Sequence, residues 1–506
     1  MSDAATSRGL NARLRRGAAW STLDVAVGRL GQFAMGVVVA RLLIPQDFGV
    51  FAVALVVHAI VINMSELGVS AALVRDDVDD VNRSAPTVAT IALATSVVLA
   101  ALMAVSASTL ARLLGSPSAS GAIAVMALTL PLAGVTAVPA ALLRRDFRMD
   151  RLFVANAANT VATALVVIPL ALAGWGAMAL AWSWVAGQLA TTVLLLTYRA
   201  GRFWPGWNRL EARRLITFGL PLAGANIVNF SVLNVDFIVV GRVLGATALG
   251  FYVLAFNISG WPMNVIGAVV RSVSLPGFAQ LRRDGEAMPE HFLSALRVVA
   301  GISLPICLIL GALARPAILT IYGDKWSAAA AALVGLSVLG ATRILLELMA
   351  DFLVSLGRTR AVFLAQLPWL VGLTIALLIA VRQHGIAGAG VAQAVVAVGL
   401  MTPIYLWFLN RAGVRPASVA GSLWSPLLWA LLAAAVAGVV AGSFSVPFVG
   451  CLVGGTAGLV VYLIPNAATI RGVVAEIRRT RAQGQDGPAS DEDLVTPGVA
   501  LVGELP

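Results

Sequence analysis

The chain has 506 residues, of which 59% are hydrophobic and 12% are charged, and its mean hydropathy is +0.91. An average soluble domain is roughly 25% charged, so this composition excludes a water-soluble protein. The net charge of +11 does not indicate nucleic-acid binding, because the basic residues are scattered between apolar runs and form no basic face with interleaved aromatics. The cysteines and histidines have no metal-ligand spacing, so we expect no metal and no cofactor.

Apolar runs recur from one end of the chain to the other and leave no room for a soluble domain. A hydrocarbon core about 30 Å thick needs roughly 20 apolar residues per spanning helix, which divides the chain into about fourteen spans. About twelve spans is the alternative if one hairpin is misread. The predicted spans cover residues 18–42, 48–72, 86–110, 119–143, 152–173, 176–198, 214–240, 247–270, 292–314, 327–354, 361–381, 386–409, 422–443 and 446–465.

The positive charges divide unevenly between the two sides that these spans define. With the N-terminus inside, most of the 35 Lys and Arg residues fall in cytoplasmic loops, and the outer loops receive Arg41, Arg112, Arg242, Arg315, Lys325 and Arg382. Because positively charged loops stay on the cytoplasmic side, we expect both termini in the cytoplasm and an even number of spans.

An internal repeat divides the spans into two halves. The stretch VVARLLIPQDFGVFAVA, from Val38, superposes without gaps on VVGRVLGATALGFYVLA, from Val239. An even number of predicted spans separates the copies, so the repeat predicts two parallel lobes of about six helices each, with a substrate cleft between them and two extra C-terminal helices. The alternative is that any two apolar hairpins look alike. The aligned pairs include Arg41 with Arg242 and Gly49 with Gly250.

This division predicts the organisation of the whole chain. The C-terminal residues are polar, acidic and contain Pro and Gly, which is typical of disorder. The predicted parts are a cytoplasmic N-terminus (1–17), an N-lobe (18–198), a cytoplasmic linker (199–213), a C-lobe (214–410), the last two spans (411–465) and a largely disordered cytoplasmic tail (466–506).

The repeat also carries a resemblance to a known family. VVVARLLIPQDFGVFAVALVV, ELGVSAALVR and FGLPLAGANIVNFSVLNVDFIVVGRVLGATALGFYVLAF resemble the polysaccharide-transporter branch of the multidrug/oligosaccharidyl-lipid/polysaccharide (MOP) flippases, the Wzx-type lipopolysaccharide and exopolysaccharide exporters. The resemblance covers residues 15–465. It implies alternating access, in which a polyprenyl-diphosphate-linked glycan enters the cleft with its headgroup while its tail stays in lipid. Membrane lipid and a polysaccharide assembly machinery are the implied partners.

Ionisable groups inside spans are functional candidates, because a bare charge in hydrocarbon is costly. In the first span, Arg29 and Gln32 are candidates to bind a diphosphate, since guanidinium makes bidentate bonds to phosphate oxygens. The alternative is a structural pair between Arg29 and Asp24, the latter being a coupling candidate. Arg271, at the cytoplasmic end of the eighth span, is a further diphosphate candidate, and a topology signal is its alternative.

The seventh span carries Asn226, Asn229 and Asp236 on one face. The asparagines would hydrogen-bond sugar hydroxyls, and the alternative is polar contacts between packed helices. Asp236 is a candidate to bind a proton or a coupling cation. His58 stands alone on an apolar span and is interpreted as a hydrogen-bonded packing residue.

Two further groups are candidates for coupling or gating. Arg343, Glu347 and Asp351 have i, i+4 and i+8 spacing and would either face the cleft or form a structural salt bridge. Arg41 and Arg242 lie at the outer ends of the first and seventh spans, where they would attract a headgroup or close an external gate. Snorkelling or capping of a helix C-terminus is the alternative for this pair.

The predicted function is a transporter that flips a lipid-linked oligosaccharide or related glycolipid across the bacterial cytoplasmic membrane for synthesis of a cell-surface polysaccharide. A drug/cation antiporter of the same superfamily is one alternative, and a membrane glycosyltransferase or polymerase is another. Such enzymes need acidic or arginine-rich external loops, whereas the predicted external loops are short and have only Asp47 and Asp324 as acids. We therefore expect no catalytic residues and no enzymatic activity.

Overall fold

The structure, a computed structural model, describes residues 31, 33–65, 78–199, 205–283 and 288–486. Helices make up nearly all of this part of the chain, and it contains no strand. Across the described residues, 11 helices are long and apolar enough to cross a membrane. The predicted all-α polytopic fold is thus confirmed. The count of fourteen spans stays a prediction, because most of the first span lies outside the described residues.

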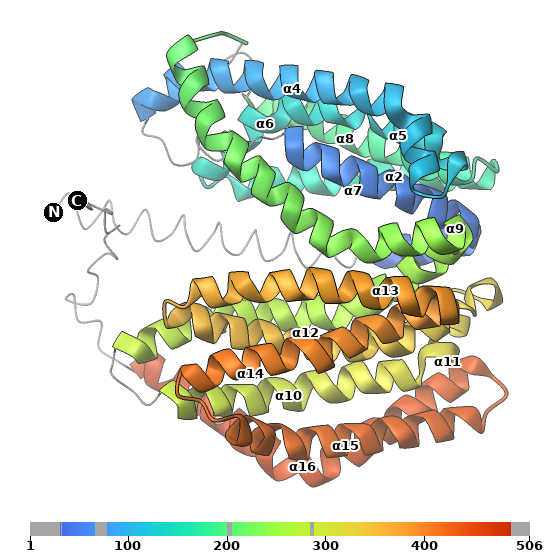
Figure 1. Ribbon diagram of the computed structural model, residues 1–506, viewed down its shortest axis with the longest axis vertical. Coiled ribbons are helices and arrows are strands. Elements are labelled where there is room, and N and C mark those ends of the chain that lie inside the picture. The colour runs from blue at the N-terminus through green and yellow to red at the C-terminus, as the bar shows by residue number, and fades with distance from the viewer. Residues whose placement is uncertain (1–30, 32, 66–77, 200–204, 284–287, 487–506) are drawn as a thin grey trace.

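The N-terminal half forms one group of helices (Figure 1). The predicted span 119–143 is broken in two by a turn at residues 127 and 128, because Pro131 has no N–H to continue the helical hydrogen bonds. After a short helix at 33–42, this N-lobe contains α2 (Pro45–Ser65), α4 (Val78–Leu113), η1 (Pro117–Ala119), α5 (Ser120–Met126), α6 (Thr129–Arg145), α7 (Met149–Leu172) and α8 (Ala177–Arg199).

The C-terminal half forms a second group (Figure 1). A π-helical stretch, η3, precedes Pro403, and α16 continues to Asp486, so residues 466–486 are helical where the sequence predicted a largely disordered tail. The elements of this half after α9 are α10 (Met288–Ala312), α11 (Ala314–Ile321), η2 (Asp324–Trp326), α12 (Ala329–Ser355), α13 (Thr359–Val395), η3 (Val396–Met401), α14 (Thr402–Arg411), α15 (Pro416–Gly442) and α16 (Pro447–Asp486).

Helix α9 (Arg209–Arg283) consists of two helical segments that are joined at Gly245, whose φ is 81°. Helix α13 is divided in the same way at Gly385, with φ 59°. Glycine adopts this left-handed conformation without the steric penalty that a Cβ brings. Both kinks fall between spans that the sequence predicts as separate.

The two lobes meet where α2 packs against the second segment of α9. A Cβ at Gly49 would lie 1.6 Å from the carbonyl oxygen of Ala246, and a Cβ at Gly250 would lie 1.9 Å from that of Pro45. The repeat aligns Pro45 with Ala246 and Gly49 with Gly250, so the contacts are reciprocal. The aligned glycines are therefore explained by close backbone packing beside the pseudo-two-fold axis.

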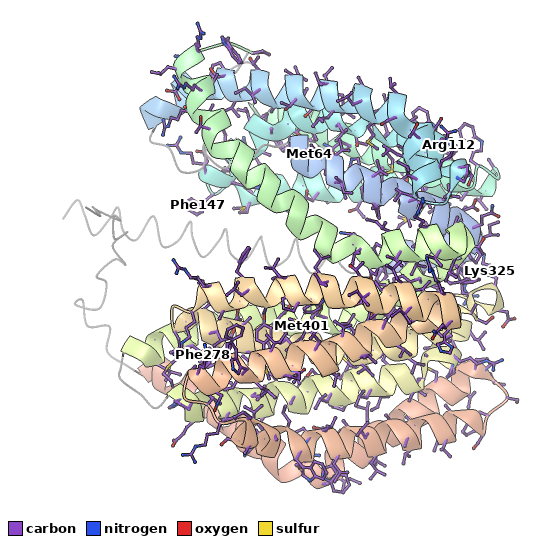
Figure 2. The ribbon with its side chains drawn as sticks, viewed as in Figure 1. Met64, Arg112, Phe147, Phe278, Lys325 and Met401 are labelled. Atoms are coloured by element: carbon purple, nitrogen blue, oxygen red, sulfur yellow. The ribbon has the colours of Figure 1, made fainter. Side chains whose placement is uncertain are left out.

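The predicted outer and cytoplasmic loops lie at opposite ends of the molecule. Figure 2 shows Arg112 and Lys325 at the end where the lobes meet, and Phe147 and Phe278 toward the opposite end. The first two belong to predicted outer loops and the last two to predicted cytoplasmic loops. We refer to the end with Arg112 and Lys325 as the contact end.

Candidate functional site

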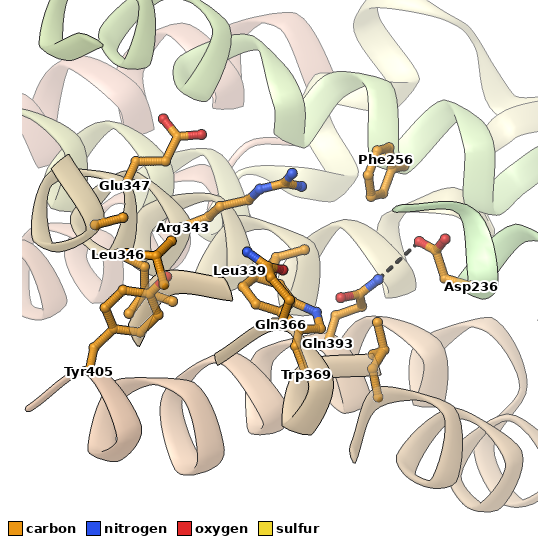
Figure 3. Close-up of a pocket in the computed structure, with 13 residues that line it drawn as sticks. Asp236, Phe256, Leu339, Arg343, Leu346, Glu347, Gln366, Trp369, Gln393 and Tyr405 are labelled. Atoms are coloured by element: carbon orange, nitrogen blue, oxygen red, sulfur yellow. Dashed lines mark hydrogen bonds between the residues drawn. The ribbon is translucent and has the colours of Figure 1, made fainter. Parts of the chain in front are cut away.

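The C-lobe contains a cavity of about 270 Å³. It brings together Asp236 of α9 with Arg343 and Glu347 of α12, three of the sequence-predicted candidates (Figure 3). Residues of α13 and α14 complete the polar lining. These are Gln366, Trp369, Gln393 and Tyr405.

Asp236 is the most deeply buried charged candidate in the described residues, with 1% of its surface exposed. Its Oδ2 atom accepts hydrogen bonds from the Tyr252 hydroxyl at 2.8 Å and from Gln393 Nε2 at 2.9 Å, and Oδ1 accepts one from the backbone N–H of Phe237 at 2.9 Å. These three donors are neutral. Both oxygens of the carboxylate thus have hydrogen-bond donors, and none of these three donors is a cation.

The stripe on α12 is only partly directed into this cavity. Arg343 extends into it toward Phe256, and Glu347 lines it beside Arg343 (Figure 3). Asp351 instead accepts a hydrogen bond from the Ser274 hydroxyl on the second segment of α9. The three residues therefore share a helix face but not one site.

Arg41 and Arg242 bind the opposite lobes at the contact end. Arg41 donates from Nε to the carbonyl of Ile321 at 2.7 Å and from Nη2 to that of Thr320 at 2.5 Å, at the C-terminus of α11. Arg242 donates to the carbonyl of Leu113, the last residue of α4. Unpaired carbonyls at a helix C-terminus attract cations.

The two helix ends that receive these arginines are also equivalent. Leu113 is followed by Gly115 with φ 78° and the turn η1, and Ile321 is followed by Gly323 with φ 94° and the turn η2. The hydrogen bonds of Arg41 and Arg242 thus cap the C-termini of α11 and α4 and also run between the two lobes.

Two residues that sequence analysis did not select strengthen this contact. Lys325 donates to the carbonyls of Arg41 and Leu43 at 2.8 and 2.7 Å, and the wholly buried Trp326 donates from Nε1 to that of Ala40 at 2.8 Å. Burial, and then the charge of Arg41, lower the pKa of Lys325, while Asp47 acts in the opposite direction. At the contact end, a lysine and a tryptophan thus both donate hydrogen bonds from the C-lobe to the N-lobe backbone.

The N-lobe contains a larger cavity, of about 530 Å³. His58 lines it and hydrogen-bonds to Thr129 at 2.7 Å. Because the Thr129 hydroxyl donates to the carbonyl of Met126 at 2.6 Å, it accepts from His58 Nε2. His58 is therefore hydrogen-bonded, as expected, but it also borders a cavity.

The remaining candidates cannot be placed in either cavity. Asp24, Arg29 and Gln32 lie outside the described residues. Asn226, Asn229 and Arg271 lie on α9, whose backbone is described there, but their side chains lie outside the description. No group of three or more His, Cys, Asp or Glu residues suited to hold a metal ion occurs in the described part of the chain.

Sequence analysis missed the neutral partners of Asp236. Tyr252 and Gln393 are polar but carry no charge at neutral pH, so a search for charges inside spans passes over them. One signal was present for Gln393: it is an amide within the apolar run 386–409. For Tyr252 the repeat offered a signal, because it occupies the position of Phe51 in the first copy.

Comparison with known sequences supplies the family. The profile of the polysaccharide biosynthesis protein family matches residues 38–331, more than half of the chain. The chain belongs to this family. It is 29% identical over 321 residues to the succinoglycan biosynthesis transport protein ExoT of Rhizobium meliloti, covering 62% of this chain and 63% of ExoT. It is 24% identical over 336 residues to the lipopolysaccharide biosynthesis protein WzxC of Escherichia coli, covering 65% of this chain and 67% of WzxC.

These alignments leave part of each relative unmatched. The chain spans less than two thirds of the length of ExoT and 30% of that of the teichuronic acid biosynthesis protein TuaB of Bacillus subtilis, with which it shares 32% identity over 147 residues. The family assignment is therefore secure for the matched core, and what the relatives transport belongs to a proposal.

Solved structures share the fold. The inward closed conformation of the lipid II flippase MurJ superposes with a TM-score of 0.73 at 13% identity, covering 89% of this chain and 100% of MurJ. An inward-facing multidrug resistance MATE transporter of the MOP superfamily gives a TM-score of 0.60 at 16% identity, covering 76% of this chain and 95% of the transporter. The family match confirms the polysaccharide-transporter resemblance seen in the sequence, these two structures show a shared fold, and the protein is a multi-pass bacterial membrane protein.

Proposed function

We propose that the protein flips a lipid-linked oligosaccharide across the bacterial cytoplasmic membrane by alternating access, and that it is a transporter and not an enzyme. One observation carries this proposal: a member of the polysaccharide biosynthesis family has two lobes joined at one end by reciprocal contacts, with a cavity in each lobe. The names of ExoT and WzxC, a transport protein and a lipopolysaccharide biosynthesis protein, support it.

The substrate of this proposal is a glycan on a polyprenyl diphosphate. Arg343 is the described cation that lines the C-lobe cavity, and its guanidinium is suited to bidentate bonds with phosphate oxygens. Arg29, Gln32 and Arg271 are proposed to contact the same diphosphate. Asn226 and Asn229 are proposed to hydrogen-bond sugar hydroxyls.

Asp236 is the proposed coupling site. A carboxylate that is buried among neutral donors is stabilised when it takes up a proton or a cation. Glu347 lines the same cavity, so release of that ion and binding of substrate would change the charge of one shared space. Asp24 is proposed to assist from the first span.

Arg41 and Arg242 are the proposed gate. Their bonds to the helix ends of the opposite lobes must break when the contact end opens. Asp351, held by Ser274, is proposed to change partner in the same transition. In the proposed orientation, with both termini in the cytoplasm, the contact end faces outward, and its closure would correspond to a state that is closed to the outside.

The test is deletion of the gene followed by analysis of membrane lipids. Flipping predicts that a lipid-linked glycan accumulates and that it is found on the inner leaflet, where an impermeant sugar-oxidising reagent added outside does not reach it. Restoring the chain should remove the accumulated lipid and restore surface polysaccharide.

Two other results would contradict the proposal. Loss of the lipid-linked glycan itself would indicate a glycosyltransferase or polymerase. Normal lipids together with increased sensitivity to cationic drugs would indicate the antiporter. The polysaccharide assembly machinery is a proposed partner, and co-purification with the full chain after mild cross-linking tests it.

A further inference from the structure

The N-lobe cavity differs in chemistry from its counterpart in the C-lobe. Continuing the ungapped repeat alignment places Met35 on Asp236, Phe51 on Tyr252 and Leu55 on Phe256. All three N-lobe residues line the N-lobe cavity. The N-lobe therefore has a thioether at the position of the C-lobe carboxylate, and a phenyl ring at the position of the tyrosine that binds this carboxylate.

The third member of the Asp236 network is replaced as well. Gln393 lies the same distance after Gly385 as Trp184 lies after Gly176, and both glycines have positive φ. Trp184 lines the N-lobe cavity. The pseudo-symmetric position thus has an aromatic surface where the C-lobe has an amide that holds a carboxylate.

No Asp, Glu, Lys or Arg occurs in the described lining of the N-lobe cavity. Its polar groups are instead neutral, and two of them, the side-chain amides of Gln188 and Asn257, have no hydrogen-bond partner among the described residues. Asn159 uses its Nδ2 atom to donate to Thr191 at 3.1 Å. Gln188 is partly exposed and Asn257 is exposed, so these amides offer donors and acceptors to a polar, uncharged ligand in the cavity.

Trp184 adds an apolar surface beside these amides. Phe51 and His58 pack edge-to-face with it, at ring-centroid distances of 5.8 and 5.9 Å, and 38% of the residue remains exposed. A ring that is supported in this way presents a rigid face with little loss of side-chain freedom. The C–H face of a pyranose ring packs on such a surface while its hydroxyls bond to neighbouring amides.

We propose that the N-lobe cavity is a subsite for an uncharged sugar of the transported glycan, while the diphosphate is bound by cationic groups elsewhere. The inference rests on the proposed flipping function and adds to it a division of the headgroup between the lobes. The cavity volume, about 530 Å³, lies in the range of about 300–1,000 Å³ that is usual for small-molecule sites. Asn257 reaches the cavity from the second segment of α9, so closure of the lobes would act on the sugar directly.

The test uses the full chain in lipid nanodiscs and two kinds of probe, farnesyl diphosphate and farnesyl diphosphate carrying glucose, galactose or N-acetylglucosamine. Calorimetry measures the affinity of each. At least one sugar-bearing probe should bind about tenfold more tightly than farnesyl diphosphate, the gain that one stacking contact and one or two hydrogen bonds provide. Trp184→Ala and Gln188→Leu, made separately, should each remove most of this gain and leave the affinity for farnesyl diphosphate unchanged.

Trp182→Ala is the matched control, because Trp182 is a similarly exposed tryptophan of the same helix that does not line the cavity. It should preserve the sugar gain. Equal affinity for all probes in the unsubstituted chain would overturn the subsite, and so would a gain that survives both cavity variants. Failure of the flipping function is seen separately, in the lipids of the deletion strain, and does not depend on these affinities.

Discussion

At the scale of single residues, the structure separates charged chemistry from neutral chemistry. Asp236 is held by three neutral donors, although a buried carboxylate is usually stabilised by a cation. Arg343 lines the same cavity and brings a positive charge to it. A site with these properties is suited to exchange a bound proton or cation as the lobes move.

Asp236→Asn should abolish coupled transport and preserve folding. The amide keeps the size of the side chain, but it neither titrates nor carries charge, so the ion-binding step is lost. We expect export of surface polysaccharide to fall by at least about tenfold, at a normal level of protein in the membrane.

Asp150→Asn is the control, since that aspartate forms only a half-exposed pair with Arg148, and such pairs contribute about 0–1 kcal/mol. Its export should be unchanged. Normal export in Asp236→Asn would refute the coupling role.

Arg343→Gln should weaken binding of the diphosphate. Hydrogen bonds to charged groups contribute roughly 1.5–3 kcal/mol, so affinity for farnesyl diphosphate should fall by about tenfold or more. Arg343→Lys keeps the charge but loses the bidentate geometry, and we expect it to recover part of the affinity. Calorimetry on the purified chain measures both. Arg315→Gln, at an exposed arginine of α11, should have no effect, and an Arg343→Gln protein with full affinity would exclude the phosphate role.

At the scale of helices, most spans could be predicted from the sequence. Each span is an apolar run of sufficient length, and charged residues, Gly and Pro mark where one run ends and the next begins. The kinks at Gly245 and Gly385 fell where the sequence separated two spans. The break before α6 was missed because it depends on a single missing N–H, that of Pro131. Apolar patterning is insensitive to such a local backbone effect.

Partners across helices were harder to predict than the helices themselves. Asp236 was selected from its place in a span, but its partners lie on the second segment of α9 (Tyr252) and on α13 (Gln393), and helical spacing does not report either contact. Arg343 and Glu347 were correctly placed on one face, whereas the Ser274 bond takes Asp351 away from the cavity. Helical spacing reports a shared face, and only the packing of neighbouring helices decides what that face meets.

Gly49→Ala or Gly250→Ala should open the contact end. Their added Cβ atoms would lie 1.6 and 1.9 Å from carbonyl oxygens, far inside the C···O contact distance of about 3.3 Å. Overpacking typically costs about 1–3 kcal/mol, so the closed state should lose roughly tenfold in population. Labelling of Leu43→Cys by an impermeant maleimide should rise accordingly. Gly442→Ala, where nothing lies within 4 Å, is the control, and unchanged labelling in both contact-end variants would contradict the tight packing.

At the scale of the whole molecule, the two lobes share a backbone plan but not a chemistry. The reciprocal contacts of Gly49 with Ala246 and of Gly250 with Pro45 show the symmetry of the closure. The exchange of Asp236 and Tyr252 for Met35 and Phe51 shows the asymmetry of the cavities. With the roles proposed for these cavities, motion about one shared contact would act on an ion site and a neutral site at the same time, and this would link the energy source to the cargo.

Joining the lobes at the contact end should stop this cycle without blocking access to the cavities. Lys325 Nζ lies 2.7 Å from the carbonyl of Leu43, so cysteines at these two positions can be joined by a short, cleavable bifunctional maleimide in a chain with Cys307→Ala and Cys451→Ala. The cross-linked protein should bind farnesyl diphosphate normally in nanodiscs, yet show no flipping in proteoliposomes until the linker is cleaved. The same treatment of cysteines at Arg148 and Asp150, which lie within one lobe, should leave flipping intact. Flipping by the protein joined across the lobes would show that the contact end does not open during transport, because a fixed gate cannot take part in alternating access.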